Sequence, residues 1–290
     1  MAWLRIFRIA LLPTIAWDFS VGILLAGIQL EQWPFAAFVA LALIYHGSMV
    51  LNDVADQKID ASAKRNRPLV TNEINRWSAL VIGLAMYSSA LLICFLFHPL
   101  LVEMCVYLLA VVLAYNFSGN KLRTFIGPAL LATARAFSLM FGVSALLGPA
   151  AALTEVAYVN IMSYALYYLF ISRLAQHEEC GLSAARGLSF LAMAFISPTL
   201  LLAQQDFSLL LLASIMAFIL FSFRSPWQLR KVFWDQAIVQ SQIRSSLCMA
   251  PIVLGLCLLA SPYSNNHVLA IFSVMVVVIT AKLAKSFAPE

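Results

Sequence analysis

The chain has 290 residues, of which 63% are hydrophobic and only 11% charged, and its formal net charge is +5. A soluble domain carries about a quarter charged residues, so this composition excludes an ordinary soluble protein. The positive charge does not indicate nucleic-acid binding, which needs a basic face on a soluble module. We therefore predict one integral membrane domain over residues 1–290.

Apolar segments long enough to span a bilayer follow one another along the whole chain, so the predicted fold is an all-α, polytopic bundle of about nine to ten helices. The predicted spans are residues 9–30, 34–51, 77–97, 99–117, 125–147, 154–172, 187–204, 207–223, 240–260 and 266–284. The first span continues past Ala26-Gly27 without a cleavage site, which is untypical of a removable signal peptide. The five cysteines have no metal-binding spacing and are expected to be apolar packing residues.

Basic residues mark alternate connections between the predicted spans. All Lys and Arg residues except Arg135 and Arg244 lie near the two ends of the chain or after the second, fourth, sixth and eighth spans. By the positive-inside rule, these connections and both termini are predicted to face the cytoplasm, across a bacterial-type inner membrane or an organellar one.

An acidic stripe, the sequence Asn52-Asp53-Val54-Ala55-Asp56-Gln57-Lys58-Ile59-Asp60, follows the second span. On a helix, spacings of three and four place Asp53, Asp56 and Asp60 on one face. Such close carboxylates repel one another unless a cation neutralises them. The stripe therefore predicts a site for Mg²⁺ and for a phosphate that the ion carries. The alternative is a solvated helix end, where the helix dipole disfavours acidic residues.

Candidate phosphate-binding side chains come after the stripe. Arg65 and Arg67 follow directly, and guanidinium groups bind phosphate oxygens through paired hydrogen bonds. The fourth span ends in Tyr115-Asn116, with Lys121 and Arg123 beyond it, an arrangement that suits a diphosphate at the membrane boundary. Positive-inside charge and tyrosine anchoring at the interface explain the same residues, so both interpretations stay open.

Two charged residues fall inside predicted spans, Asp18 in the first and Arg135 in the fifth. Charges within a membrane are costly and are usually paired or functional. Either these two residues pair with each other, or Arg135 reaches the phosphates. His46 precedes the stripe by about two turns and either touches an acceptor or is a hydrogen-bonded core residue.

The loop after the sixth span contains the other adjacent pair of acids, Glu178 and Glu179. Four helices separate this loop from the stripe. A parallel four-helix repeat would place the two loops face to face, as at the repeat interfaces of many membrane proteins. Both loops are then expected to border one cytoplasm-facing cavity. The alternative is that the two glutamates form a solvated helix end.

At these residues the chain resembles the UbiA-type membrane prenyltransferase superfamily. The family's first motif, NDxxDxxxD, is matched at Asn52, Asp53, Asp56 and Asp60. The sequence Arg67-Pro68-Leu69 is also typical, and Tyr115 with a basic residue in the next loop resembles the family's helix four–five loop. The resemblance covers nearly the whole chain.

The resemblance implies a helical bundle around a central cavity, in which Mg²⁺ joins the aspartates to an isoprenyl diphosphate. Ionisation gives an allylic cation, stabilised by aromatic faces, and an aromatic or other small acceptor captures it. The residues implied to be catalytic are Asp53, Asp56, Asp60 and Tyr115. The predicted diphosphate-binding residues are Asn52, Arg65, Arg67, Asn116, Lys121, Arg123, Arg135 and Arg173. The predicted metal ligands are Asp53, Asp56, Asp60 and Glu178.

The chain departs from the family pattern in the helix six–seven loop. The family's second motif is usually another aspartate cluster, but here Ser172-Arg173-Leu174-Ala175-Gln176-His177-Glu178-Glu179 stands in its place. This sequence resembles a divergent branch of UbiA-like proteins, including those of the bacterial and algal Ebo clusters, whose second motif is rich in arginine and glutamate. Glu178 is therefore expected to supply one metal ligand, and Arg173 to replace a metal as counter-charge. A tenth span also exceeds the usual nine.

The predicted function is thus Mg²⁺-dependent transfer of an isoprenyl group to a small acceptor within the lipid bilayer. The altered second motif motivates a competing hypothesis, a non-catalytic membrane protein that binds or moves a polyprenyl or other amphipathic metabolite. A scaffold for a biosynthetic complex is a third.

Overall fold

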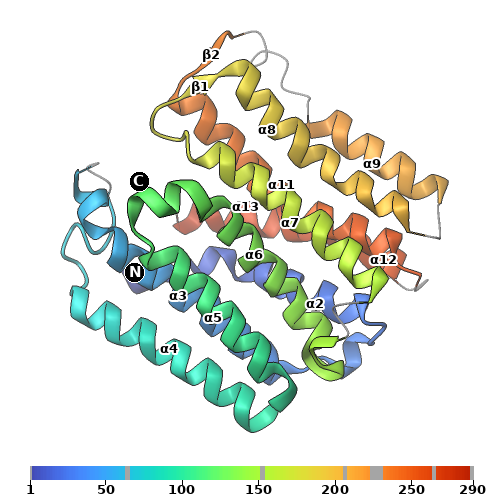
Figure 1. Cartoon of the computed structure of the whole chain (residues 1–290), viewed down its shortest axis with the longest axis horizontal. Helices are drawn as coiled ribbons and strands as arrows, with labels where there is room; N and C mark the ends of the chain where they lie inside the picture. The colour runs from blue at the N-terminus through green and yellow to red at the C-terminus, as the bar shows by residue number, and fades with distance from the viewer. Residues whose placement is uncertain are drawn as a thin grey trace.

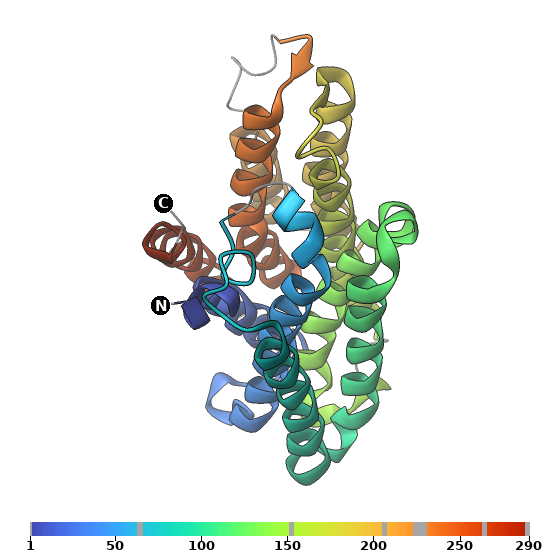
Figure 2. The same cartoon turned by 90° about the vertical axis from the view of Figure 1, so that its left-hand side faces the viewer.

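The computed structural model describes residues 2–62, 66–150, 154–204, 208–222, 231–262 and 266–287. Long helices lie side by side, joined by short connections at their ends (Figures 1 and 2). The α-helices are α1 (Ala2–Ile6), α2 (Leu12–Leu25), α3 (Phe35–Ser62), α4 (Arg76–Phe97), α5 (Val102–Phe117), α6 (Gly119–Leu147), α7 (Glu155–Ala175), α8 (Ala184–Ile196), α9 (Leu209–Ser222), α11 (Gln236–Ala260), α12 (Asn266–Ala270) and α13 (Phe272–Phe287). Short 3-10 helices are η1 (Ile9–Leu11), η2 (Leu30–Gln32), η3 (Pro99–Leu101) and η5 (Ser197–Ala203).

The predicted all-α fold is confirmed, because each predicted span contains a helix. Several helices extend beyond their predicted bounds, and the extensions of two of them bear on the acidic stripe. Helix α3 continues to Ser62, so the whole acidic stripe is helical. Helix α6 begins at Gly119, whose φ of 74° allows α5 to turn directly into α6. Arg123, expected in a loop, therefore lies on the first turns of α6.

Several helices have the length and apolarity of membrane spans. Within the described ranges, those long and apolar enough to cross a membrane cover Phe35–Ser62, Arg76–Phe97, Pro99–Phe117, Leu122–Leu147, Ala184–Ala203 and Gln236–Ala260. Shorter apolar helices cover Ile9–Leu25, Leu209–Ser222 and Val268–Leu283. The chain is thus an integral membrane protein.

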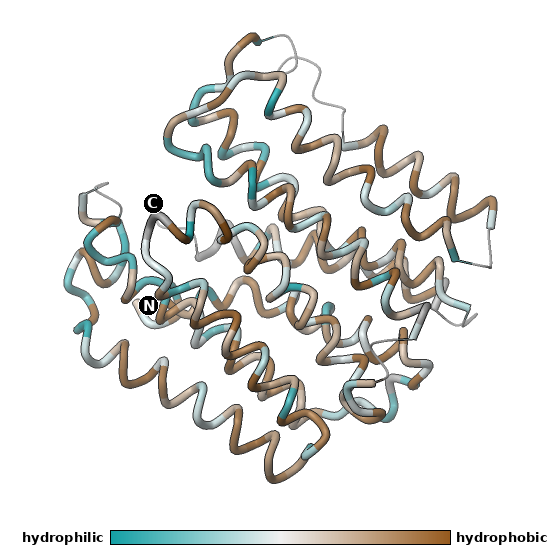
Figure 3. Tube along the Cα trace, in the orientation of Figure 1, coloured by the Kyte–Doolittle hydropathy of each residue, from teal (hydrophilic) through white to brown (hydrophobic). Residues whose placement is uncertain are grey.

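Polar residues gather at one end of the bundle. The end of α3, the junction of α5 with α6 and the connection after α7 all lie at the left-hand end in Figure 1. The hydropathy colouring is most hydrophilic there, whereas the helix centres are apolar (Figure 3). The predicted assignment of this end to the cytoplasm stays a prediction.

Helices α2 and α6 lie between two apolar cores. One core unites side chains of α7, α8, α9 and α11, and the other unites those of α3, α4 and α5; both include residues of α2 and α6. The two helices approach closely at Gly22 and Gly142. A Cβ atom on Gly22 would lie 2.3 Å from the Leu139 carbonyl oxygen, and one on Gly142 would lie 2.3 Å from the Phe19 carbonyl oxygen. Small residues at this crossing let the backbones touch.

Two short strands were not predicted. Strands β1 (Leu182–Ser183) and β2 (Phe233–Trp234) pair antiparallel and join the loop after α7 to the segment before α11. Trp234 is fully buried, and its ring occupies the position that a Cβ atom on Gly187 of α8 would take. The polar loop after α7 is therefore held in a defined position.

Replacing Gly142 by Ala should destabilise the protein by about 2 kcal/mol or more, because the added methyl group meets backbone that cannot move aside. The measurement is the thermal unfolding midpoint in detergent. Gly127→Ala on the same helix is the matched control, since a Cβ atom there meets only side-chain atoms, the nearest at 3.3 Å. Equal midpoints for the two variants would contradict the close crossing of α2 and α6.

Candidate functional site

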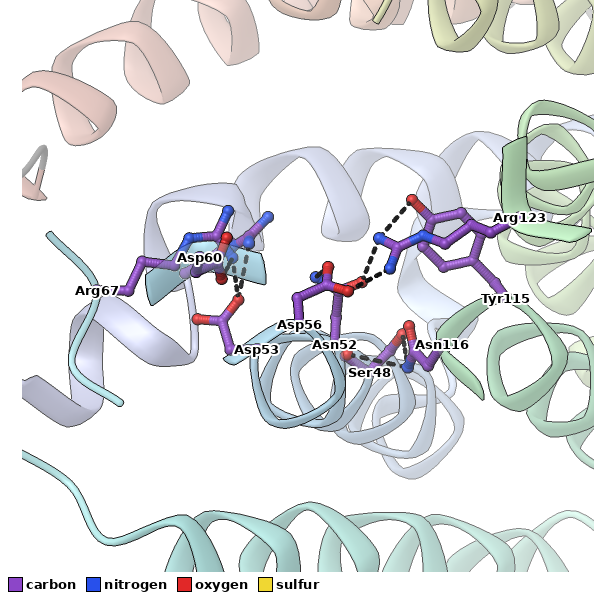
Figure 4. Close-up of polar contacts among 10 residues, drawn as sticks. Ser48, Asn52, Asp53, Asp56, Asp60, Arg67, Tyr115, Asn116 and Arg123 are labelled. Atoms are coloured by element: carbon purple, nitrogen blue, oxygen red, sulfur yellow. Dashed lines mark hydrogen bonds and ion pairs between the residues drawn. The ribbon is translucent and has the colours of Figure 1, made fainter. Parts of the chain in front are cut away.

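The three aspartates of α3 are each paired with arginine, and they form two groups on the helix (Figure 4). Arg67 lies between two of them: its Nη1 atom is 2.7 Å from Asp53 Oδ1 and 3.0 Å from Asp60 Oδ2. The side chain of Asp60 is only 1% exposed and that of Asp53 only 5%. Two nearly buried carboxylates thus share one guanidinium group, which offsets their mutual repulsion.

The other group surrounds Arg123 of α6. Its Nη1 atom donates to Asp56 Oδ1, and its Nη2 atom donates to Asn52 Oδ1 at 3.0 Å and to the Tyr115 hydroxyl at 3.2 Å. The guanidinium group also lies over the Tyr115 ring, 4.5 Å from its centroid. Asn52 donates to Asp56 across one helical turn. The predicted motif residues Asn52, Asp56, Tyr115 and Arg123 are therefore brought together.

Asn116 points to α3 and not to the arginines. Its Nδ2 atom donates to the carbonyl oxygen of Ser48 at 3.3 Å, and the residue is buried. The amide thus holds α5 against α3, one turn before Asn52. Arg65 and the side chain of Lys121 lie outside the described residues.

A third arginine reaches the stripe from the amino-terminal segment. Arg8 Nη2 lies 3.1 Å from Asp53 Oδ1, the same oxygen that Arg67 contacts. In the sequence, Arg8 is one of the basic residues that indicate topology. Since 45 residues separate Arg8 from Asp53, no local spacing could have revealed the pair.

The loop after α7 lies beside the start of α6. Arg173, on the last turn of α7, donates to Gln176, and Gln176 donates to the carbonyl oxygen of Thr124, the neighbour of Arg123. Glu178 follows in the same turn. Over the described ranges, however, no three acidic, histidine or cysteine side chains converge in a way that could hold a metal ion. The position of Glu178 as a metal ligand therefore stays a prediction.

The two intramembrane charges pair with each other. Arg135 Nη1 lies 2.8 Å from Asp18 Oδ2, and the Tyr164 hydroxyl donates to Asp18 Oδ1 at 2.6 Å. The guanidinium group also lies over the rings of Tyr45 and Tyr168. The predicted alternative in which Asp18 and Arg135 pair with each other is thus the one seen in the structure. The ion pair joins α2 to α6 between the two cores. A contact of Arg135 with diphosphate remains untested.

His46 serves as a hydrogen-bonded core residue. Its Nδ1 atom lies 2.7 Å from the carbonyl oxygen of Phe7, and the residue is buried. The ring thus fastens the amino-terminal segment to α3 directly before Arg8.

The stripe fits Mg²⁺ by its chemistry. Carboxylate oxygens are the ligands that Mg²⁺ prefers, and Asp53 and Asp60 both reach the same nitrogen of Arg67. The arginines now occupy the oxygens that a metal would take, so binding of the metal requires a change of partner. The site thus combines acids that suit a cation with arginines that suit an anion.

The chain thus combines an apolar helical bundle with a cluster of paired acids and arginines at one end. The sequence model of the UbiA prenyltransferase family matches residues 11–229, and the chain belongs to that family. Two solved structures have a similar fold. Both are of a UbiA homologue from Archaeoglobus fulgidus, one bound to DMAPP and Mg²⁺ and the other bound to GPP and Mg²⁺.

These similarities extend along the whole chain. The DMAPP complex is 15% identical with a TM-score of 0.54, and the match covers 98% of this chain and 99% of that one. The GPP complex is 14% identical with a TM-score of 0.51, covering 98% of this chain and 100% of that one. At this identity the likeness concerns the fold. The search of curated proteins gave no match.

Replacing Asp18 by Leu, or Arg135 by Met, should each cost about 3–5 kcal/mol, because either change leaves a buried charge without its partner. The double variant should be more stable than the sum of the single effects predicts. The measurement is the thermal unfolding midpoint of the four proteins in detergent. Strictly additive effects would show that the two residues do not stabilise the bundle as a pair.

Proposed function

We propose that this protein transfers an isoprenyl group from an isoprenyl diphosphate to an aromatic or other small acceptor in the membrane, with Mg²⁺ as cofactor. The observation that carries the proposal is the placement of Asp53, Asp56 and Asp60 on one helix with arginines against them, in a chain of the UbiA family. The Mg²⁺ complexes of the similar fold with DMAPP and with GPP support the choice of donor.

Both the aspartates of α3 and the arginines beside them are proposed to take part in binding the diphosphate. Mg²⁺, when held by the aspartates, would neutralise the leaving diphosphate and so favour cleavage of the bond to the isoprenyl carbon. Arg67 contacts Asp53, and Arg123 contacts Asp56. Both arginines have guanidinium donors for phosphate oxygens. Arg173 sits on the adjoining helix end, so it is proposed as a further counter-charge.

Tyr115 is proposed to position Arg123 and to present an aromatic face beside it. The Arg123 guanidinium carbon lies over the Tyr115 ring, 4.5 Å from its centroid, so the ring face is open to a cation. The neighbouring helices are lined with apolar side chains, which would keep water from capturing an allylic cation before the acceptor does. Asn52 supports the same arrangement through its bonds to Asp56 and Arg123.

A second candidate is a carrier that binds an isoprenyl diphosphate without cleaving it. The observation in its favour is that the aspartates are already paired with arginines and do not converge with Glu178 among the described residues. The two candidates differ in whether diphosphate is released.

In lipid-reconstituted protein, Asp56→Asn should lower Mg²⁺-dependent release of inorganic diphosphate from geranyl, farnesyl or geranylgeranyl diphosphate by roughly 100-fold or more, since lost charge stabilisation acts directly on the cleaved bond. The assay is run with and without a panel of aromatic acceptors. Glu103→Gln is the control, because Glu103 is on α5 and bonds to Tyr107 away from the stripe.

Unchanged release in Asp56→Asn would refute the assigned site. Binding of the isoprenyl diphosphate without release, across all acceptors, would favour the carrier. Thermal unfolding of each variant separates a loss of chemistry from a loss of folding.

A further inference from the structure

The amino-terminal segment, residues 2–8, is packed onto the half of α3 that bears the stripe. Ile6 is fully buried, in one apolar cluster with Val50 and Val54 of α3 and Leu69 of the loop that follows α3. Trp3 and Phe7 pack against the same cluster. The segment is thus packed against α3 next to the acidic stripe.

Two polar contacts hold the segment in place. The carbonyl oxygen of Phe7 bonds to His46 of α3, and Arg5 forms an ion pair with Glu73 of the loop after α3. The hydrogen bond from Arg5 holds the pKa of Glu73 below its usual value. The segment is therefore bound to α3 on one side and to the neighbouring loop on the other.

The backbone at Arg8 is held in an unfavourable conformation. Its φ of 50° and ψ of 47° are left-handed, a region that L-residues with a side chain rarely adopt. Asn72, next to Glu73, is the other non-glycine residue with positive φ in the described ranges. Strained residues of this kind persist where the surroundings over-determine them, which is often at functional sites. From this conformation the Arg8 side chain contacts Asp53.

The side chain of Arg8 is more accessible than the carboxylate it contacts. Arg8 is 36% exposed, whereas Asp53 is 5% exposed and already bonded to Arg67 through the same oxygen. Because Arg67 already contacts Asp53, that carboxylate keeps a guanidinium partner when Arg8 turns to another anion. A guanidinium group has five N–H donors, so Arg8 has donors for an anion that arrives from the accessible side.

We propose that Arg8 is a diphosphate-binding residue, which makes the amino-terminal segment part of the substrate site. The inference rests on the proposed function. Asp53 would be one of the carboxylates that hold Mg²⁺, and the Arg8 guanidinium group, which now contacts Asp53, would then donate to a phosphate oxygen of the diphosphate. No covalent bond changes in this step.

The proposal predicts effects of opposite sign on two binding constants. Arg8→Gln should weaken binding of inorganic diphosphate in the presence of Mg²⁺ by about tenfold, the effect of losing one hydrogen bond to a charged group. The same variant should tighten binding of Mg²⁺ alone severalfold, because Asp53 loses a competing cation. Isothermal titration of the protein in lipid nanodiscs measures both, first with Mg²⁺ and then with diphosphate.

Arg5→Gln is the matched control, since it removes a guanidinium group from the same segment without touching the stripe. It should change either binding constant by less than about twofold. Arg8→Lys, which keeps the charge but not the paired donors, should lie between Arg8→Gln and the unchanged protein. Thermal unfolding of each variant reports whether the segment stays packed.

Three results would overturn the proposal. One is unchanged diphosphate binding in Arg8→Gln; another is an equal loss in Arg5→Gln, which would assign the effect to docking of the segment. Failure of the unchanged protein to bind diphosphate with Mg²⁺ would overturn the proposed function as well. The first two outcomes concern Arg8 alone, so the two failures are distinguishable.

Discussion

Three carboxylates within two turns of one helix in an apolar protein repel one another unless cations lie beside them. In this chain the cations are guanidinium groups from three separate segments: the amino-terminal segment, the loop after α3 and the first turns of α6. Each segment is held near α3 partly by this attraction. The charge requirement of one helix therefore fixes where the neighbouring parts of the chain lie.

The packing of α2 and α6 sets the framework for that arrangement. Close approach at Gly22 and Gly142 places the two helices between the apolar cores. Asp18 and Arg135 then meet inside the bundle and neutralise each other. Because α6 also carries Arg123 on its first turns, the helix that forms the buried ion pair brings a cation to the stripe. Packing inside the bundle and charge pairing at its polar end are thus linked through one helix.

The helices and the stripe could be predicted because their signals are local: apolar length for the spans, and spacings of three and four for the acids. Partners distant in sequence left no such signal. Arg123 and Asp56 are 67 residues apart, and although each is a candidate for a Mg²⁺–diphosphate site, the sequence does not predict the contact between them. Arg8 had no motif around it, and its charge was fully explained by topology. Strands β1 and β2 are too short for any periodicity to reveal them.

Under the proposed function, the pairing of acids with arginines couples the affinity for Mg²⁺ to the affinity for diphosphate. Arginines on the carboxylate oxygens lower the affinity for Mg²⁺ alone, because the metal must displace them. A diphosphate that draws the arginines away removes this competition. Coupling between two ligands is reciprocal, so Mg²⁺ must strengthen diphosphate binding by the same factor. The two ligands are then expected to bind as a unit, which keeps the acids neutralised at every stage and leaves neither set of charges exposed beside the lipid.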